Sequence, residues 1–307
     1  MGFSMRRVRN LVRPVHWALA AALPPVPKRH YMHWAGTGRW GDFTNPKTFN
    51  EKVNWRILHD RRPQIAEACD KASMKERARR AVPDESVLRI PETIWMGTNP
   101  DEAPVRTSRP WILKPNHSSG EVLPSDRADA EALRRTREWL VSKPAVQLGE
   151  WGYRVARPLL LMEELIPFAG EEPPRDYKFF VFDGVPRLVQ VNADRFSDQP
   201  RESFFDPKGR VVPLRDARLP VPIRGADPLP GNWAQMVDLA ARLGSGWDFI
   251  RIDLYSVAGE VWFGEYSPYP GGGVTRYRPA SWDRTMGDWW TLPSDVGADV
   301  ARSSRGA

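Results

Sequence analysis

Two kinds of apolar pattern along the chain predict its helices and strands. At residues 48–59, apolar residues recur every three to four positions after Asn45 and Pro46, which predicts a helix, and further helices are predicted at 63–81, 126–142 and 233–243. Short runs rich in β-branched and aromatic residues predict strands at 90–95, 110–114, 159–164, 177–182, 187–191, 204–205, 249–255 and 260–266. Strands gathered around few helices indicate an α+β fold rather than repeated βαβ units.

The predicted elements divide the chain into segments. Residues 1–41 are expected to form a basic N-terminal arm, and residues 42–108 a helical region with the first strands. Two α+β lobes are expected at residues 109–165 and 166–293, and a disordered tail at 294–307. Because prolines are frequent between Arg215 and Pro230, that stretch is expected to be an ordered loop.

Composition and charge limit the possible partners. The 307 residues include 45 basic and 38 acidic side chains, a formal net charge of +7, and their 41% apolar content suffices for a large core. The arm before Asp42 has no acid, and its cations alone equal the net charge: Arg6, Arg7, Arg9, Arg13, Lys28, Arg29 and Arg39. The remaining body is neutral overall, which argues against a nucleic-acid partner.

The two most informative residues are acids on neighbouring predicted strands. Asp253 and Glu265 lie in apolar runs joined by a turn at Ala258-Gly259, so antiparallel pairing can put both carboxylates on one face. Buried acids are costly without a cation, and hard oxygen ligands of this kind suit Mg²⁺ that carries nucleotide phosphates. A surface ion pair between Asp253 and Arg251 is the structural alternative.

A lysine followed by a small polar loop is a second candidate site. Lys114 ends a predicted strand, and the loop that follows contains His117, Ser118, Ser119 and Gly120. Such a loop offers backbone N–H groups and hydroxyls to phosphate oxygens, while the lysine supplies charge. Serine–glycine turns are common and His117 also suits an ordinary loop, so this pattern alone indicates phosphate binding only weakly.

Taken in order, short strings of the sequence resemble the TupA-like branch of the ATP-grasp superfamily over residues 46–273. The strings are Asn45-Pro-Lys-Thr-Phe-Asn-Glu-Lys52, Asp70-Lys71, Leu113-Lys-Pro-Asn-His-Ser-Ser-Gly120, Glu163-Glu164, Asp176-Tyr-Lys-Phe-Phe180, Asp194-Arg-Phe196, Arg251-Ile-Asp-Leu-Tyr255 and Phe263-Gly-Glu265. The resemblance implies an ATP-grasp fold, in which a small lobe (109–165) and a large lobe (166–293) clamp ATP between them.

The resemblance also implies a set of site residues. Those expected to bind the nucleotide are Lys71, Lys114, His117, Ser118, Ser119, Gly120, Glu163, Glu164, Ile166 and Asp176. The cations expected to stabilise the transferring phosphoryl group are Lys178, Arg195 and Arg251. The expected magnesium ligands are Asp253, Glu265 and Ser267, although Ser267 stands where many superfamily members have asparagine and is a weaker ligand or none.

The implied activity is the ATP- and Mg²⁺-dependent joining of a carboxylate to an amine through an acyl phosphate, in the assembly of a cell-surface polysaccharide or polymer. The expected partners are a small-molecule or glycan carboxylate, such as a uronic acid, and an amine, such as an amino acid. Pro270 to Gly273 follow where such enzymes often bind the carboxylate, with a plain flexible loop as the alternative. Two other functions stay open: a phosphotransferase acting on a sugar or carboxylate, and a catalytically idle membrane-associated scaffold.

A cytoplasmic location is expected. The arm has the outline of a signal peptide, but His16 interrupts a weak apolar run and an ATP-consuming enzyme belongs where ATP is. Cys69 is the single cysteine, so no disulfide can form within the chain. The basic arm also predicts peripheral contact with the inner face of an anionic membrane, with a solvated or packed arm as the alternative, since prolines such as Pro14 and Pro24 break its apolar stretch.

Overall fold

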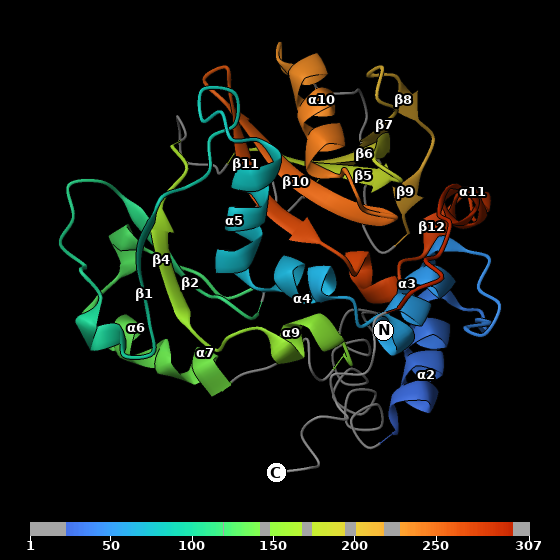
Figure 1. Cartoon of the computed structure of the whole chain (residues 1–307), viewed down its shortest axis with the longest axis horizontal. Helices are drawn as coiled ribbons and strands as arrows, with labels where there is room; N and C mark the ends of the chain where they lie inside the picture. Colours follow the sequence, from blue (N-terminus) through green and yellow to red (C-terminus); the bar gives the residue numbers. More distant parts are fainter. Residues whose placement is uncertain are drawn as a thin grey trace, which may run out of the picture.

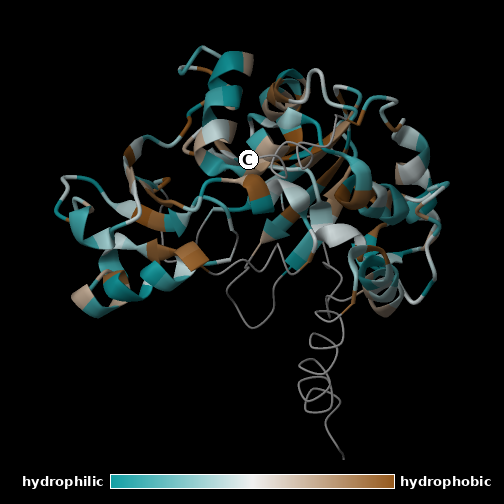
Figure 2. Cartoon of the chain, turned by 60° about the horizontal axis from the view of Figure 1, so that its bottom comes forward, coloured by the Kyte–Doolittle hydropathy of each residue, from teal (hydrophilic) through white to brown (hydrophobic). Residues whose placement is uncertain are grey.

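A computed structural model of the chain describes residues 23–118, 120–141, 148–167, 174–193, 201–217 and 228–296. Two antiparallel sheets lie beside each other, with helices between them and on their outer faces (Figure 1). Hydrophobic segments gather in the interior around each sheet, and the outer loops are largely hydrophilic (Figure 2). The predicted α+β class is confirmed by this arrangement.

The smaller sheet has four strands in the order β1-β4-β2-β3. They are β1 (Thr93–Gly97), β2 (Trp111–Pro115), β3 (Leu123–Pro124) and β4 (Leu160–Glu164). Leu113 and Met162 lie in the apolar cluster that this sheet forms with helices α6 (Ala130–Arg135) and α7 (Arg137–Val141). Because successive side chains of a strand point to opposite faces, Lys114 and Glu163 lie on the other face, where they meet helix α5 (Lys71–Ala81).

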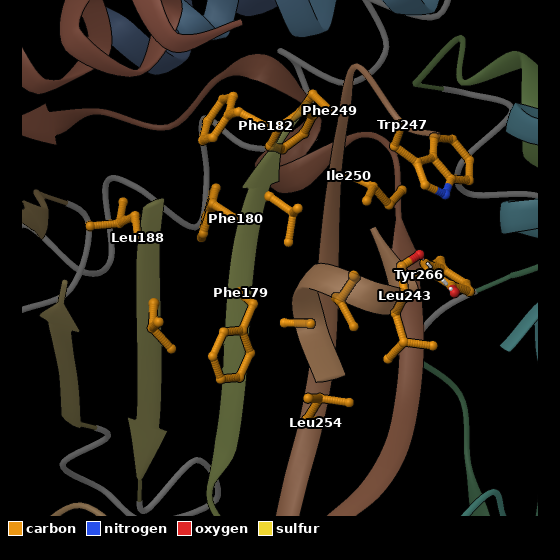
Figure 3. Packing of buried hydrophobic residues seen from close by; sticks show 14 of the residues in the cluster. Phe179, Phe180, Phe182, Leu188, Leu243, Trp247, Phe249, Ile250, Leu254 and Tyr266 are labelled. Carbon is orange, nitrogen blue, oxygen red and sulfur yellow. Dashed lines mark hydrogen bonds between the residues drawn. The ribbon is translucent and has the colours of Figure 1, made fainter. Parts of the chain in front are cut away.

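The larger sheet has six strands in the order β11-β10-β5-β6-β7-β8. They are β5 (Asp176–Phe182), β6 (Val185–Ala193), β7 (Arg201–Phe205), β8 (Val211–Val212), β10 (Phe249–Val257) and β11 (Glu260–Ser267), and a separate pair joins β9 (Arg215–Asp216) to β12 (Tyr277–Arg278). One face packs against helix α10 (Trp233–Leu243), whose Leu243 lies near Leu254 and accepts a 3.1 Å hydrogen bond from the Tyr266 hydroxyl (Figure 3).

The opposite face of the larger sheet is only partly covered by helices. Phe49, the first residue of α3 (Phe49–His59), packs against Phe182 and Phe249, with ring centroids 6.1 and 5.0 Å away. Beyond this aromatic cover, the same face of β10 continues with Arg251 and Asp253 at the two-residue spacing of a strand. Helix α3 thus covers the Phe249 end of this face and leaves Arg251 and Asp253 uncovered.

The remaining helices surround the two sheets. They are α2 (Pro25–Thr37), α3, α4 (Pro63–Cys69), α5, α9 (Trp151–Val155) and α11 (Ser281–Trp289), with short 3₁₀ turns at Pro100–Glu102, Ser125–Arg127 and Pro270–Gly273. Helix α3 begins at a capping box in which Thr48 and Glu51 exchange side-chain and backbone hydrogen bonds. Helix α5 lies between the two sheets (Figure 1), so its residues can act on both.

The helix predicted at residues 63–81 is wrong as a single element, because the chain breaks at Asp70 into α4 and α5. The Asp70 carboxylate caps the new helix by accepting a 2.9 Å hydrogen bond from the Ser73 backbone N–H. The charges on α5 are also less solvated than the sequence suggests, because Lys75 is buried. The predicted stretch 126–142 is likewise divided, into a 3₁₀ turn, α6 and α7.

The N-terminal arm is structured over its second half. Helix α2 begins at Pro25, and both Pro25 and Pro27 lie in its first turn, where backbone N–H groups need no intrahelical partner. Arg29, counted among the cations of the arm, is buried rather than solvated. Residues 1–22, the tail beyond Val296 and most of the proline-rich stretch, from 218 to 227, lie outside the described residues.

The turn between β10 and β11 offers a test of the fold. Ala258 (φ 50°) and Gly259 (φ 85°) both have a left-handed backbone conformation. Asp183 (φ 49°) and Gly184 (φ 72°), between β5 and β6, have the same conformation. Alanine is disfavoured there, so Ala258→Asn is expected to raise the free energy of unfolding by about 0.5–1 kcal/mol. Urea denaturation measures the change. Asp183→Asn is the matched control and should have little effect, and a destabilised Ala258→Asn would contradict the turn geometry.

Candidate active site

The predicted pairing of the two acids is confirmed, since Asp253 and Glu265 are directly opposite each other on β10 and β11. Arg251 joins them: its Nε donates to Asp253 Oδ1 at 2.7 Å, and one of its terminal nitrogens donates to Glu265 Oε1 at 3.0 Å. On β11, Ser267 is opposite Arg251 and therefore shares this face. The hairpin thus presents an acid pair bridged by one guanidinium group.

A second cation reaches the same acid from the next strand. Lys178 on β5 is opposite Asp253, and its Nζ donates to Asp253 Oδ2 at 2.6 Å and lies 3.3 Å from Asp176 Oδ2. Asp253 is only 2% exposed. Its burial alone would raise its pKa, but Arg251 and Lys178 outweigh burial and hold the pKa below its usual value. The pairing of Asp253 with Arg251 therefore exists, but inside the protein rather than on its surface.

The donor set of this hairpin fits a magnesium ion that arrives with nucleotide phosphates. The Glu265 side chain is 36% exposed, so one carboxylate of the pair remains accessible. No cluster of three or more His, Cys, Asp or Glu able to hold a metal occurs among the described residues. Mg²⁺ usually takes only one or two protein carboxylates and completes its shell with phosphate oxygens and water, so two suffice here.

Lys114 on the small sheet and Lys75 on α5 meet at one buried acid. Glu163 on β4 forms ion pairs with both Lys114 on β2 and Lys75 on α5. These two ammonium groups outweigh the effect of burial and lower the pKa of Glu163. The sequence predicted Glu163 as a nucleotide-binding residue, and the structure shows its carboxylate as the shared counter-ion of two lysines.

Lys71 ties the predicted phosphate loop to the first turn of α5. Its Nζ donates to the backbone oxygens of Pro115, at 2.9 Å, and of Ser118. Burial and the nearby Lys114 lower the pKa of Lys71 to about 8, while Glu265 and Glu163 act in the opposite direction. Lys71 thus lies within electrostatic range of Lys114 on the small sheet and of Glu265 on the large one.

A clamp centred on Asp70 holds the base of this loop. Its carboxylate accepts hydrogen bonds from Arg157, at 2.8 and 2.9 Å, and from the side-chain amide of Asn116 at 2.7 Å. The Asn116 side chain in turn accepts from the Ala72 backbone N–H at 2.9 Å. Three distant segments, the start of α5, the end of β2 and the approach to β4, are thereby fixed together.

The other predicted residues vary in how close they lie to this region. His117 and Ser118 are buried, and Gly120 has the left-handed backbone (φ 97°) that favours glycine. Glu164 lies 3.7 Å from Arg109, and Ile166 follows the end of β4. Ser119 and Arg195 lie outside the described residues.

A cleft of about 320 Å³ opens beside the hairpin. Its lining residues come from the uncovered face of the large sheet, from the glycine loop (Pro270–Gly273) with Thr275 just after it, and from the separate pair β9 and β12: Lys178, Phe180, Gln190, Asn192, Glu202, Phe204, Asp216, Arg251, Glu265, Pro270, Gly271, Thr275 and Tyr277. The loop is held in place rather than flexible, because Asn54 donates to the Gly273 oxygen at 2.8 Å and Arg29 donates to the Gly272 oxygen. All three of its glycines have positive φ.

Sequence reasoning missed Lys75, Arg157, Glu202 and Asp216. Lys75 carried a usable signal, since it follows Lys71 by four residues and therefore lies on the same face of α5. Arg157, Glu202 and Asp216 carried none, because their partners and the cleft are formed by segments far apart in the chain.

Replacing Lys114 tests the small-lobe side of the site. Lys114→Ala is expected to weaken ATP binding about tenfold, because one charge-assisted contact to a phosphate is lost. The fold should persist, since Glu163 keeps its ion pair with Lys75. Calorimetric titration with ATP measures the affinity, and Lys208→Ala, an exposed lysine beyond β7, is the control. Equal ATP affinity in Lys114→Ala and the wild type would remove Lys114 from the site.

The fold is the one expected of an ATP-grasp protein. A family model described as TupA-like ATP-grasp matches residues 51–291, and the chain belongs to this family. Membership of an ATP-grasp family makes ATP, with Mg²⁺, the cofactor, as the sequence predicted. A comparison with curated proteins found no match.

Among solved structures, the chain is similar to the ATP-grasp ligase PsnB complexed with a phosphomimetic variant of its minimal precursor, Mg and ADP (15% identity, TM-score 0.36). It is also similar to the macrocyclase MdnC bound with precursor peptide MdnA from Microcystis aeruginosa MRC (14%, 0.39) and to D-alanine-D-alanine ligase from Helicobacter pylori (14%, 0.41). The matches cover 67, 75 and 80% of this chain and 52, 62 and 69% of those chains. The chain thus spans less than two thirds of the length of PsnB and MdnC.

Proposed function

We propose that this protein is a ligase that uses ATP to activate a carboxylate as an acyl phosphate and joins it to an amine, with release of ADP and phosphate. The observation that carries the proposal is the convergence of Lys178, Arg251 and the acid pair at one end of the cleft. Membership of the ATP-grasp family implies that ATP is the nucleotide, and the cleft has room for an acceptor beside it.

In the first step, a carboxylate oxygen attacks the γ-phosphorus of ATP, and the bond to the β-phosphate oxygen breaks. Attack of one anion on another needs positive charge, which Lys178 and Arg251 supply within a buried region. Asp253 and Glu265 would hold Mg²⁺, which neutralises phosphate charge when bound. Lys71 and Lys114 would bind the phosphates from the small-lobe side, and Arg195 remains a third proposed catalytic cation.

In the second step, the amine attacks the acyl carbon and phosphate leaves. Water has to be kept out, because it would hydrolyse the acyl phosphate. The loop from residue 117 to residue 120 is proposed to provide this exclusion by covering the nucleotide, and Lys71 holds its first residues through the Ser118 oxygen. No covalent enzyme intermediate is required, in keeping with a single buried cysteine, Cys69.

The proposed substrates are a uronic acid or similar glycan carboxylate and an amino acid, in cell-surface polymer synthesis. The polarity of the cleft supports a hydroxyl-rich substrate, because Gln190, Asn192 and Thr275 line it together with Phe180 and Phe204. Substrate identity is assigned here by family analogy together with this chemistry.

Phosphate release from ATP and Mg²⁺ with panels of uronic acids and amino acids tests the activity. Release of ADP and phosphate that requires both a carboxylate and an amine is the expected result. ADP formation without any amine, together with a stable phosphorylated sugar, would instead indicate a phosphotransferase. Absence of Mg²⁺-dependent ATP binding would indicate a catalytically idle scaffold.

The proposed location is the cytoplasm, with peripheral contact to the inner face of the membrane through the N-terminal arm. No helix in the part of the chain that the structure describes is long and apolar enough to cross a bilayer. Within the arm, Trp40 is 70% exposed and its ring stacks on the exposed Trp34, with the ring centroids 6.2 Å apart. Exposed tryptophans beside a basic segment support contact with an anionic membrane surface.

Deleting residues 1–22 is expected to weaken binding to anionic vesicles about tenfold or more at low salt, because four arginines are lost. The deletion stops there since Arg29 is buried and anchors the glycine loop. Vesicle sedimentation measures the binding, and unchanged ATP affinity controls for folding. Equal vesicle binding by the full and shortened chains would end the membrane proposal.

A further inference from the structure

Glu150 is a buried acid beside the glycine loop to which the activity proposed above gives no role. It precedes α9 and is only 6% exposed. Its Oε1 lies so close to the loop that a Cβ added to Gly272 would be 3.4 Å from it. The carboxylate therefore packs against the backbone of the loop that borders the cleft.

No hydrogen bond or ion pair holds this carboxylate among the described residues. Arg29 is the cation that acts on the pKa of Glu150. Its guanidinium, however, donates its hydrogen bonds to Asn54 Oδ1, at 2.7 Å, and to the backbone oxygens of Leu148 and Gly272. Burial raises the pKa of Glu150 to about 7, and Arg29 opposes the rise. An unpaired acid is costly inside a protein, so a retained one is a candidate for a ligand.

Helix α9, which begins just after Glu150, carries a tyrosine that is influenced by charged groups on both sides. Tyr153, one turn further along α9, lies within electrostatic reach of Glu150 and also of Glu265 and Arg251. Gly271, the neighbour of Gly272 in the loop, lines the same cleft as Arg251. Glu150 thus lies against Gly272, whose neighbour Gly271 lines the cleft.

We propose that Glu150 is the binding residue and proton acceptor for the amine substrate, an inference that rests on the ligase function proposed above. An ammonium group supplies the charge and the hydrogen-bond donors that this carboxylate lacks. A divalent ion is a poorer fit, because no cluster of three or more acidic, histidine or cysteine ligands occurs in the described parts of the chain.

The proton balance of the second step follows from this assignment. The bound ammonium gives one proton to the Glu150 carboxylate and becomes a neutral amine with a free electron pair. That pair forms the bond to the acyl carbon as the bond from carbon to the phosphate oxygen breaks. The second proton lost from nitrogen leaves on the phosphate as hydrogen phosphate, and Glu150 returns its proton to solvent.

Amine binding tests the inference without turnover. Calorimetry with the enzyme saturated with Mg²⁺ and ADP uses glycinamide, the standard amino acids and glucosamine as probes. At least one amine should bind the wild type, and its affinity should fall as the pH drops below about 7, where Glu150 gains a proton. The other titratable groups that face Glu150 are Cys69, Tyr153 and Tyr269, whose pKa values burial raises, and Arg29, which stays charged.

Glu150→Gln should weaken that affinity about tenfold and remove its pH dependence, because an isosteric amide cannot attract an ammonium by charge. Glu150→Asp should keep part of the amine affinity and part of its pH dependence. Glu85→Gln, a change at an exposed residue, should match the wild type in both. Equal affinity in Glu150→Gln and the wild type, or no amine binding to the wild type, would overturn the inference. Failure of the ligase function is distinct: the wild type would then form no acyl hydroxamate with hydroxylamine, ATP and any uronic acid.

Discussion

Asp253→Asn is expected to abolish turnover, by at least about 10³-fold, and to lower the free energy of unfolding by about 3–5 kcal/mol. If Asp253 were a solvated metal ligand, the change would remove a metal charge with little loss of folding. The structure argues otherwise, because Asp253 is buried between Lys178 and Arg251. An asparagine would leave two buried cations with too little negative charge.

Chemical denaturation and phosphate release from ATP measure the two effects of Asp253→Asn separately. Lys178→Met in the same chain removes one of the uncompensated cations, so the double variant should recover part of the lost stability without recovering turnover. A single variant as stable as the wild type would show that Asp253 is not the centre of the buried charge network.

Glu265→Gln is expected to lower turnover about 10³-fold while leaving the fold intact, a loss of about 4 kcal/mol of transition-state stabilisation. Its side chain is partly exposed and makes a single ion pair, so loss of its charge costs little stability. The activity loss should be smaller at high Mg²⁺ if the effect comes from weaker metal binding. Glu260→Gln, at the exposed start of the same strand, is the matched control.

Turnover in Glu265→Gln equal to that of Glu260→Gln would refute the metal assignment. A loss of unfolding free energy in Glu265→Gln as large as its loss of transition-state stabilisation would also count against the metal assignment, because it would indicate a structural rather than a chemical role. Thermal unfolding of both variants distinguishes these outcomes.

The acid pair could be predicted from the sequence because it depends on local rules. Asp253 and Glu265 flank a two-residue turn at nearly equal distances, and strand alternation then puts them on one face. The register shift after Asp253, which leaves Gly264 as the extra residue of the bulge, did not disturb this pairing. Lys114 before its loop was predictable for the same reason, since a strand end and a loop are local features.

The break at Asp70 and the burial of Lys75 could not be predicted from local patterns. Asp70 ends a helix because Arg157 and Asn116 bind it from remote segments. Lys75 lies in a run of basic residues typical of a solvated helix, and only the packing of β4 against α5 brings Glu163 to it. Helix α2 was missed for a different reason, since prolines that interrupt a helix interior are tolerated in its first turn.

The central claim is that both sheets neutralise one triphosphate, and calorimetric titration with the non-hydrolysable analogue β,γ-imido-ATP tests it most directly. Binding should require Mg²⁺ and should weaken about tenfold both in Lys114→Ala, on the small sheet, and in Glu265→Gln, on the large one. Affinity that is independent of Mg²⁺ and unchanged in both variants would contradict a shared nucleotide site.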